Sequence, residues 1–322
     1  YVRIRGESVT GQIRKALFDA AGRPRLRQYL IEKHHWSNAT FDTVNWAATR
    51  GAITGLTIPE HRFVVKLSFH QLPVGFRLRQ REGHIPANCP SCDNPVEDDW
   101  HWITCQHRAE WRETQHTLLS NRLSALHTHP GLQFLLLRAF ADVLTTGDCD
   151  FFGAQLDPDE SRLIESQTSI GWPHLLCGRF SVEWAMIQDQ YTDDNEIDRK
   201  HCSGLAWTIK VTQHIWRALH SLWKLRNTAL HGTTFTESEA TRRTRIEPLV
   251  RRIYSQIFRL SPADQVMLRK PLAERLQQPL SLIETWLSLV QPAFDAAALS
   301  NDDSVDMDKS DDCNDLDLIN PG

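Results

Sequence analysis

The sequence predicts a mainly α-helical protein, with helical domains, one small irregular loop insert and a disordered C-terminal tail. Along most of the chain, apolar residues recur three or four positions apart, which is the spacing of one helix face. The strict apolar–polar alternation of a half-buried strand does not persist between turn residues. With 322 residues, 41% of them hydrophobic, the chain can bury a sizeable core in one large domain or two.

Before the loop insert, helices are expected over residues 13–20, 26–31, 44–53 and 63–72. Gly22 and Pro24 should close the first helix, because neither residue favours a helix interior. Pro59 and Glu60 should start the fourth, since proline and acidic residues suit a first helical turn. Pro73 should end it.

Residues 84–100 have loop composition, dominated by His, Pro, Cys, Asn and Asp. Beyond this loop, helices are expected over residues 106–127, 131–145, 160–168, 173–190, 199–231, 237–259 and 279–299. The longest of these places Ile209, Trp216 and Trp223 on one face. Residues 301–322 hold eight Asp and almost no bulky apolar side chain, which predicts a disordered acidic tail.

The ends of the chain and its cysteines narrow the class of protein. The chain begins at Tyr1 and not at Met, so we expect a piece of a longer polypeptide. No run of 18 apolar residues is present, which argues against a membrane span. Three of the seven cysteines fall within 17 positions, unlike the denser, more even spacing of a secreted disulfide scaffold. We therefore expect an intracellular protein, in the nucleus or the cytoplasm.

The net charge of −4 combines four blocks of opposite sign. Residues 1–88 carry +8 and residues 200–300 carry +7. Residues 89–199 carry −12 and residues 301–322 carry −7. This segregation raises the question of a polyanion that binds the basic blocks.

One part of the loop has the spacing of metal ligands. Cys89, Cys92, His101 and Cys105 follow the pattern C-x2-C-x8-H-x3-C. The C-x2-C pair turns two sulfurs toward one point, and His101 and Cys105 share one face of a helical turn. Four such ligands suit a tetrahedral Zn²⁺ ion, and because no coordination position stays open, the one zinc should be structural.

The alternative is a chance cluster of reduced core cysteines, since free cysteine often behaves as a small buried hydrophobe. The polar composition of the segment argues against that interpretation. His84 and His107 are spare ligands should His101 point away. The expected organisation is a basic helical segment (1–83), a zinc-binding loop (84–112), a helical domain (113–300) and a disordered acidic tail (301–322).

Two stretches resemble a known family. The Leu72-Pro73 turn, the CPSC at 89–92, an acidic spacer with Glu97 and the HWITC at 101–105 resemble the zinc-binding segment after the polymerase of non-LTR retrotransposon reverse transcriptases. This match covers about residues 44–112. The W-x2-RN…HG of residues 223–232 resembles a C-terminal helix of similar element-derived proteins. The resemblance implies the non-catalytic C-terminal region of a reverse transcriptase-like protein. Its RNA-directed DNA polymerase would precede Tyr1.

Two enzyme motifs have simpler interpretations. Residues 191–194 match the Y-x-D-D of reverse transcriptases, in which paired carboxylates bind Mg²⁺ between apolar strands. Here the flanks are an acidic loop after a helix, so we interpret the motif as a solvated charge run.

The second motif, R-N-x3-H at Arg226 and His231, resembles that of HEPN ribonucleases. If the resemblance holds, His231 could act as general acid or base in RNA cleavage and Arg226 could stabilise a phosphorane. In the structural interpretation, which we favour, the aliphatic part of the Arg226 side chain lies along the apolar helix face that carries Trp216 and Trp223. This interpretation also places a partly cationic His231 at a helix C-terminus before Gly232.

Arginine residues are the candidate contacts to nucleic acid, and six are selected: Arg77, Arg79, Arg81, Arg245, Arg252 and Arg259. The first three lead into the zinc loop, and the last three, seven apart, should share one face of the helix expected over 237–259. The sequence therefore predicts a zinc-dependent fold that binds RNA or DNA and has no enzymatic activity of its own. The alternatives are a protein-interaction or scaffolding module and a HEPN-like ribonuclease.

Overall fold

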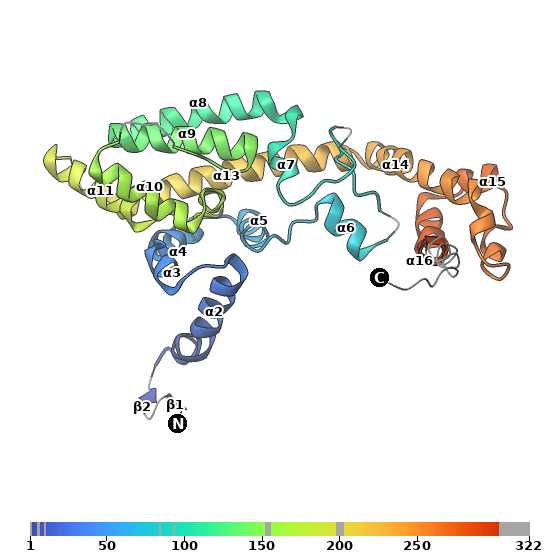
Figure 1. Cartoon of the computed structure of the whole chain (residues 1–322), viewed down its shortest axis with the longest axis horizontal. Coiled ribbons are helices and arrows are strands. Elements are labelled where there is room, and N and C mark those ends of the chain that lie inside the picture. Colours follow the sequence, from blue (N-terminus) through green and yellow to red (C-terminus); the bar gives the residue numbers. More distant parts are fainter. Residues whose placement is uncertain are drawn as a thin grey trace, which may run out of the picture. The chain divides into compact units, whose positions relative to one another are not determined.

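The computed structural model describes residues 2–4, 7–9, 11–83, 85–92, 94–151, 156–197 and 203–302. Within these ranges the protein is mainly α-helical, as the sequence predicts (Figure 1). A short antiparallel hairpin of β1 (Val2–Ile4) and β2 (Glu7–Val9) was not expected. The predicted disordered tail lies outside the described residues from 303 onward, and residues 301 and 302 end the last helix. No helix in the described ranges has both the length and the apolar character needed to cross a bilayer.

The chain divides into two compact units, and each unit combines two segments that are distant in the sequence. Unit 1 contains residues Tyr1–Leu72 and Trp100–Leu225. Unit 2 contains residues Pro73–Asp99 and Arg226–Gly322. This division follows tertiary contacts and cuts across the linear segments 1–83, 84–112 and 113–300.

After the β1–β2 hairpin, the first segment of unit 1 is mainly helical. Its elements are α1 (Ile13–Leu17), the π-helical turn η1 (Phe18–Gly22), α2 (Arg23–His34), α3 (Asn38–Thr43), α4 (Trp46–Thr54) and α5 (Ile58–Ser68). The expected stop at Gly22 and Pro24 is wrong, because Gly22 keeps helical angles and Pro24 occupies the first turn of α2. The expected start at Pro59 and Glu60 is confirmed, since Thr57 and Glu60 form a capping box at α5.

The second segment of unit 1 contains α7 (His101–Thr104), η2 (Gln106–Arg108), α8 (Ala109–Ala125), α9 (Pro130–Thr146), α10 (Pro158–Ile170), η3 (Trp172–Cys177), α11 (Val182–Asp194) and the start of α13 (Gly204–His231). The single helix expected over 173–190 is wrong, because the chain leaves the helix at Gly178, where φ is +72°. A Cβ there would lie 2.4 Å from the Trp216 ring, so the turn requires glycine. Residues 191–194 form the last turn of α11 and not a loop.

Tryptophan side chains fill much of the core of unit 1. Trp184, Trp207 and Trp216 are fully buried, and the rings of Trp184 and Trp207 stack. The indole Nε1 of Trp207 donates to Oγ1 of Thr128 at 2.8 Å, which satisfies its one polar group. These residues therefore stabilise the packing of the helices in unit 1.

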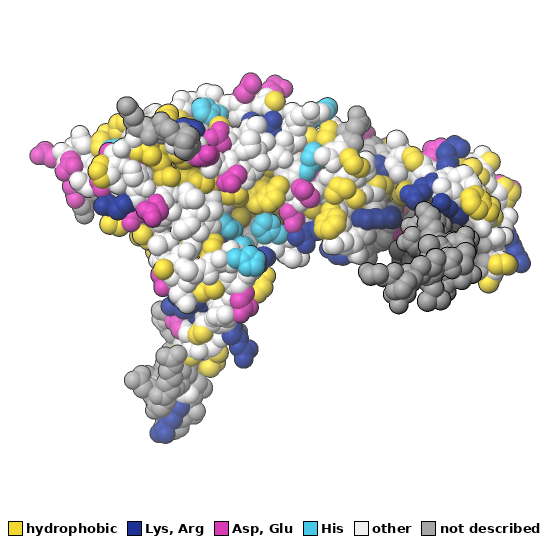
Figure 2. Space-filling view, in the orientation of Figure 1, with side chains coloured by type: hydrophobic (Ala, Val, Ile, Leu, Met, Phe, Trp, Pro, Cys, Tyr) yellow, Lys and Arg dark blue, Asp and Glu magenta, His cyan; other side chains and the backbone are white. Residues whose placement is uncertain are grey.

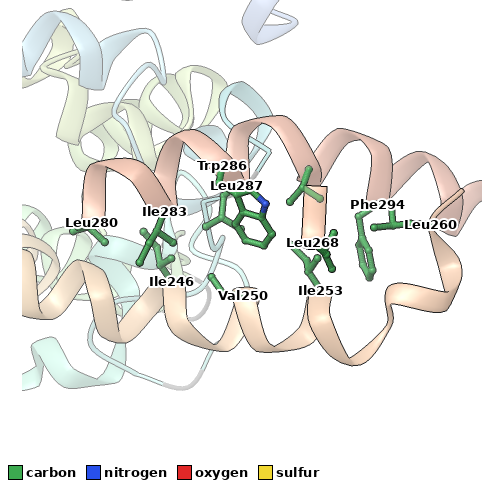
Figure 3. Packing of buried hydrophobic residues seen from close by; sticks show 11 residues of the cluster. Ile246, Val250, Ile253, Leu260, Leu268, Leu280, Ile283, Trp286, Leu287 and Phe294 are labelled. Carbon is green, nitrogen blue, oxygen red and sulfur yellow. The ribbon is translucent and has the colours of Figure 1, made fainter. Parts of the chain in front are cut away.

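Unit 2 contains α6 (Gly75–Arg81), the end of α13, α14 (Phe235–Ser255), η4 (Ile257–Arg259), η5 (Asp264–Leu268), α15 (Leu272–Gln277) and α16 (Leu280–Asp302). Apolar residues of α14 and α16 face each other in its core (Figure 3). Ile246 and Ile253 pack with Ile283 and Leu287, and Trp286 donates to the carbonyl of Met267 at 2.8 Å. Because α14 ends at Ser255, the helix expected over 237–259 is too long by one turn.

Candidate metal centre

The structure brings together the four residues that the spacing selected. The ligand atoms of Cys89, Cys92, His101 and Cys105 all lie within 4.8 Å of one another. Cys89 and Cys105 are buried, and the other two are partly exposed. This group could hold a metal ion, and four protein ligands would leave no coordination position open for a substrate.

Local backbone geometry explains why these side chains converge. The amide of Cys89 donates to the carbonyl of Asn94 at 3.0 Å, which closes the turn that carries the first two cysteines. The amide of Ser91 donates to Sγ of Cys89 at 3.4 Å, which orients this sulfur within the turn. The amide of Cys105 donates to the carbonyl of His101 at 2.8 Å, so the helical turn of α7 places both residues on one side.

The spare histidines do not enter the group. His107 is exposed in η2 and is not among the four clustered ligands. His84 lies outside the described residues.

The residues around α7 anchor it in unit 1. Trp102 is 1% exposed, and its ring packs edge-on against those of Phe63 and Trp223. Arg112 of α8 donates to the carbonyl of Cys105 at 3.0 Å. Trp102 is thus a core residue, which leaves it no face for stacking on nucleobases.

A buried ion pair supports the loop from within unit 2. Glu97 is 0% exposed and Arg226 is 1% exposed. Nε of Arg226 donates to Oε1 of Glu97 at 2.9 Å, and Nη2 pairs with Oε2. This two-bond geometry is the strongest arrangement of a guanidinium and a carboxylate. Sequence reasoning placed each residue in a motif but gave no sign that they meet across 129 positions.

Glu97 also connects the loop to the start of α6. Its Oε2 accepts from the amide of Gly75 at 2.8 Å, and its own amide donates to the carbonyl of Ala87 at 2.7 Å. Its carbonyl accepts from the amide of Phe76 at 3.0 Å. A Cβ on Gly75 would lie 2.3 Å from the Ala87 carbonyl oxygen, so only glycine fits this contact.

The six selected arginines have different environments. Arg77 forms a two-bond pair with Asp99, and Arg79 lies 3.6 Å from a carboxylate oxygen of Asp295. Half-buried Arg245 donates to the carbonyl of Pro86 at 3.3 Å.

The remaining three, Arg81, Arg252 and Arg259, are exposed, and none has an ion pair within the described part of the chain. Arg252 lies over the Phe294 ring. Arg259 lies in η4, beyond the end of α14, so it does not continue the helix face of Arg245 and Arg252.

The R-N-x3-H motif lines a cavity of about 700 Å³ in unit 2. Burial, together with Arg226, Arg245 and Arg242, lowers the pKa of His231. This lowered pKa disfavours the cationic imidazole and so works against the expected interaction with the helix C-terminus. The expected role of Gly232 is confirmed, because it ends α13 with φ +73° and donates to the carbonyl of Thr228.

Comparisons of this chain with protein-family models, with curated proteins and with solved structures found no match. The function must therefore be inferred from the chemistry of the site. The features that bear on it are the clustered thiols and imidazole and the buried ion pair of Glu97 in the same loop.

Proposed function

We propose that this chain is the non-catalytic C-terminal region of a retrotransposon-type, reverse transcriptase-like protein, with a zinc-dependent fold that binds RNA or DNA. The buried pair of Glu97 and Arg226 is the observation that carries the proposal. Glu97 belongs to the acidic spacer of the zinc segment, and Arg226 belongs to the W-x2-RN helix. Each of the two stretches that resemble this family thus supplies the charge that neutralises the buried charge of the other. This is expected if the two stretches belong to one inherited structural unit.

Zinc is the metal that best fits the donor set. Three thiolates and one imidazole are soft to borderline ligands, and four protein donors without a carboxylate are typical of structural zinc. The bound ion with three thiolates and a neutral imidazole carries a net charge of −1. The centre would then repel phosphate, and contacts to nucleic acid must come from arginines.

The exposed arginines of unit 2 supply those contacts. Arg81, Arg252 and Arg259 have no carboxylate partner in the described ranges, so phosphate binding would break no ion pair there. Lys and Arg side chains are numerous on the part of the surface formed by α14 to α16 (Figure 2). Guanidinium groups in such positions bind phosphate through paired N–H donors.

Salt-dependent binding of fluorescein-labelled single-stranded RNA and DNA, followed by anisotropy, tests this function. The triple variant Arg81→Gln, Arg252→Gln, Arg259→Gln should lower the slope of log K against log salt by about 2, since each phosphate contact to a single strand contributes about 0.7. The matched control makes the same charge change at arginines that have carboxylate partners: Arg162→Gln, Arg217→Gln and Arg251→Gln.

A wild-type slope near zero would refute nucleic-acid binding and favour the protein-interaction or scaffolding module. Equal losses in the two triple variants would show that only net charge matters. The ribonuclease alternative has its own test, because RNA cleavage that disappears in His231→Ala would establish it. In the structure Arg226 is already occupied by Glu97, which leaves no free guanidinium for a phosphorane.

A further inference from the structure

A second cavity lies within unit 1 and belongs to none of the sites above. Its volume is about 820 Å³, within the usual range for small-molecule sites. Helices α2, α4 and α5 contribute to its lining, which is mostly apolar and includes Leu26, Phe41, Trp46, Val65 and Phe69.

Arg179, which also lines this cavity, carries a buried charge. It is 3% exposed. Its Nη1 lies 2.9 Å from Nε2 of His34 and 2.8 Å from Nδ1 of His174, and its Nη2 donates to the carbonyl of Ser68 at 3.0 Å. None of these partners is a carboxylate, and no ion pair of Arg179 exists in the described ranges.

The two histidines accept from Arg179 without balancing its charge. Burial and the nearby guanidinium lower the pKa of His34 to about 3 and that of His174 to about 2, so both rings are neutral near pH 7. A charge removed from water is normally paired. Here the positive charge of Arg179 has only neutral partners.

The hydrogen bonds of Arg179 leave some of its donors without a protein acceptor in the described ranges. A guanidinium has five N–H donors, and three of them are used by His34, His174 and Ser68. Two donors remain, one on Nε and one on Nη2, and a carboxylate can accept two hydrogen bonds from these neighbouring nitrogens.

The charges at the cavity add to this preference for an anion. Arg23, Arg27 and Arg50 also line it; Arg23 pairs with Asp19 and Arg27 with Asp42, so in the described ranges Arg50 and Arg179 are the lining arginines without an ion pair. The cavity is therefore apolar with an excess of positive charge.

We propose that this cavity binds a small organic carboxylate with an apolar body. The carboxylate occupies the two remaining donors of Arg179, and the apolar body lies against Phe41, Trp46 and Phe69. This site is separate from the arginines assigned to nucleic acid, so either function can fail without the other.

Isothermal titration calorimetry of the full chain tests the proposal with 6-phenylhexanoate and its neutral analogue 6-phenylhexan-1-ol. The carboxylate should bind at least about tenfold more tightly, because its negative charge neutralises the buried guanidinium of Arg179. The hydroxyl can accept a hydrogen bond from Arg179 but leaves its charge unbalanced. Arg179→Met should bring the two affinities together.

A second variant tests the same cavity without changing Arg179, in case Arg179→Met does not fold. Ala47 is exposed and lines the cavity, so Ala47→Trp should fill it and abolish binding of both probes. Ala125→Trp, at an exposed position of α8 away from the cavity, is the matched control and should bind like the wild type. Equal affinities of the wild type for the two probes, no heat of binding at about 1 mM carboxylate, or unchanged binding by Ala47→Trp would each overturn the proposal.

Discussion

At the scale of single residues, the molecule depends on buried charges whose partners are far away in the sequence. Glu97 and Arg226 neutralise each other in unit 2, whereas Arg179 in unit 1 relies on two neutral imidazoles. Removing a charge from water costs several kcal/mol per ion unless hydrogen bonds and an opposite charge offset it. These two sites should therefore respond differently to mutation and to pH.

Loss of either partner of the Glu97–Arg226 pair should destabilise the fold by about 3–5 kcal/mol, because the other charge stays buried without compensation. Chemical denaturation of Glu97→Gln, Arg226→Met and the double variant measures this. The double variant should lose less than the sum of the single losses. Arg162→Gln, which breaks the ion pairs of an exposed arginine with Asp159 and Glu183, should cost less than about 1 kcal/mol. Additive losses in the double variant would show that the two charges do not interact.

Acid should destabilise unit 1 through His34 and His174. Their pKa values are lowered from 6.5 in the folded state to about 3 and about 2. The unfolded chain therefore binds protons first as the pH falls, and stability declines from about pH 6.5 down to about pH 3. The variant His34→Gln, His174→Asn keeps an acceptor near each ring nitrogen but cannot titrate. Its urea midpoint should fall less between pH 7 and pH 4 than that of the wild type, whereas exposed His116→Gln should change nothing.

At the scale of elements, short local structures position the candidate metal ligands. The turn after Cys89 and the four-residue helix α7 each place two ligands, and the loop between them is pinned by Glu97. Such a loop has little apolar content of its own, so close backbone contacts must supply much of its stability, and a metal ion held by the four clustered residues would add to it.

The contact between Gly75 and Ala87 should not tolerate a side chain. Gly75→Ala places a Cβ 2.3 Å from a backbone oxygen, which cannot rotate away, and should cost about 1–3 kcal/mol. The matched control is Gly83→Ala, whose Cβ would meet its nearest atoms at 3.9 Å. Its unfolding free energy should change by less than about 0.5 kcal/mol. Equal stability of both variants in urea would mean that the approach of α6 to the loop is not tight.

Metal content is the direct test of the candidate centre. The purified protein should contain one zinc per chain, and Cys92→Ser should lose it, because three ligands hold zinc less firmly than four. Plasma mass spectrometry measures the zinc, and chelation should lower the thermal midpoint. Cys149→Ser, at a free cysteine that is not among the clustered ligands, is the control and should keep its zinc. A wild-type protein free of zinc and other transition metals would end the metal assignment.

At the scale of the whole molecule, each unit is completed by a segment distant in sequence. Residues 73–99 belong with the chain after Arg226, including the α14–α16 core. A chain truncated after Leu225 should therefore lose hydrogen-exchange protection in residues 73–99 and retain more of it in α8 and α9. Truncation after Asp302, at the end of α16, should leave both regions protected. Preserved protection of residues 73–99 in the shorter chain would contradict the division into units.

The sequence by itself determined the helices and the four clustered residues. Helical periodicity and ligand spacing are local patterns, and the physics that produces them acts over one or two turns. The errors arose where local signals were overridden. Gly22 and Pro24 continue a helix, and Gly178 interrupts one because its backbone must pass the Trp216 ring.

Only the tertiary structure decided which charges are buried and with whom. Glu97 and Arg226 lie 129 residues apart, and Arg179 meets His34 across 145 residues, distances over which no sequence pattern fixes a pair. Pairing of this kind follows from the packing of whole helices. The free-energy cost of burying each charge is offset only when the fold places its distant partner in contact with it. For the same reason, only the tertiary structure distinguished the selected arginines that have a carboxylate or carbonyl partner from the three that are exposed without an ion pair in the described ranges.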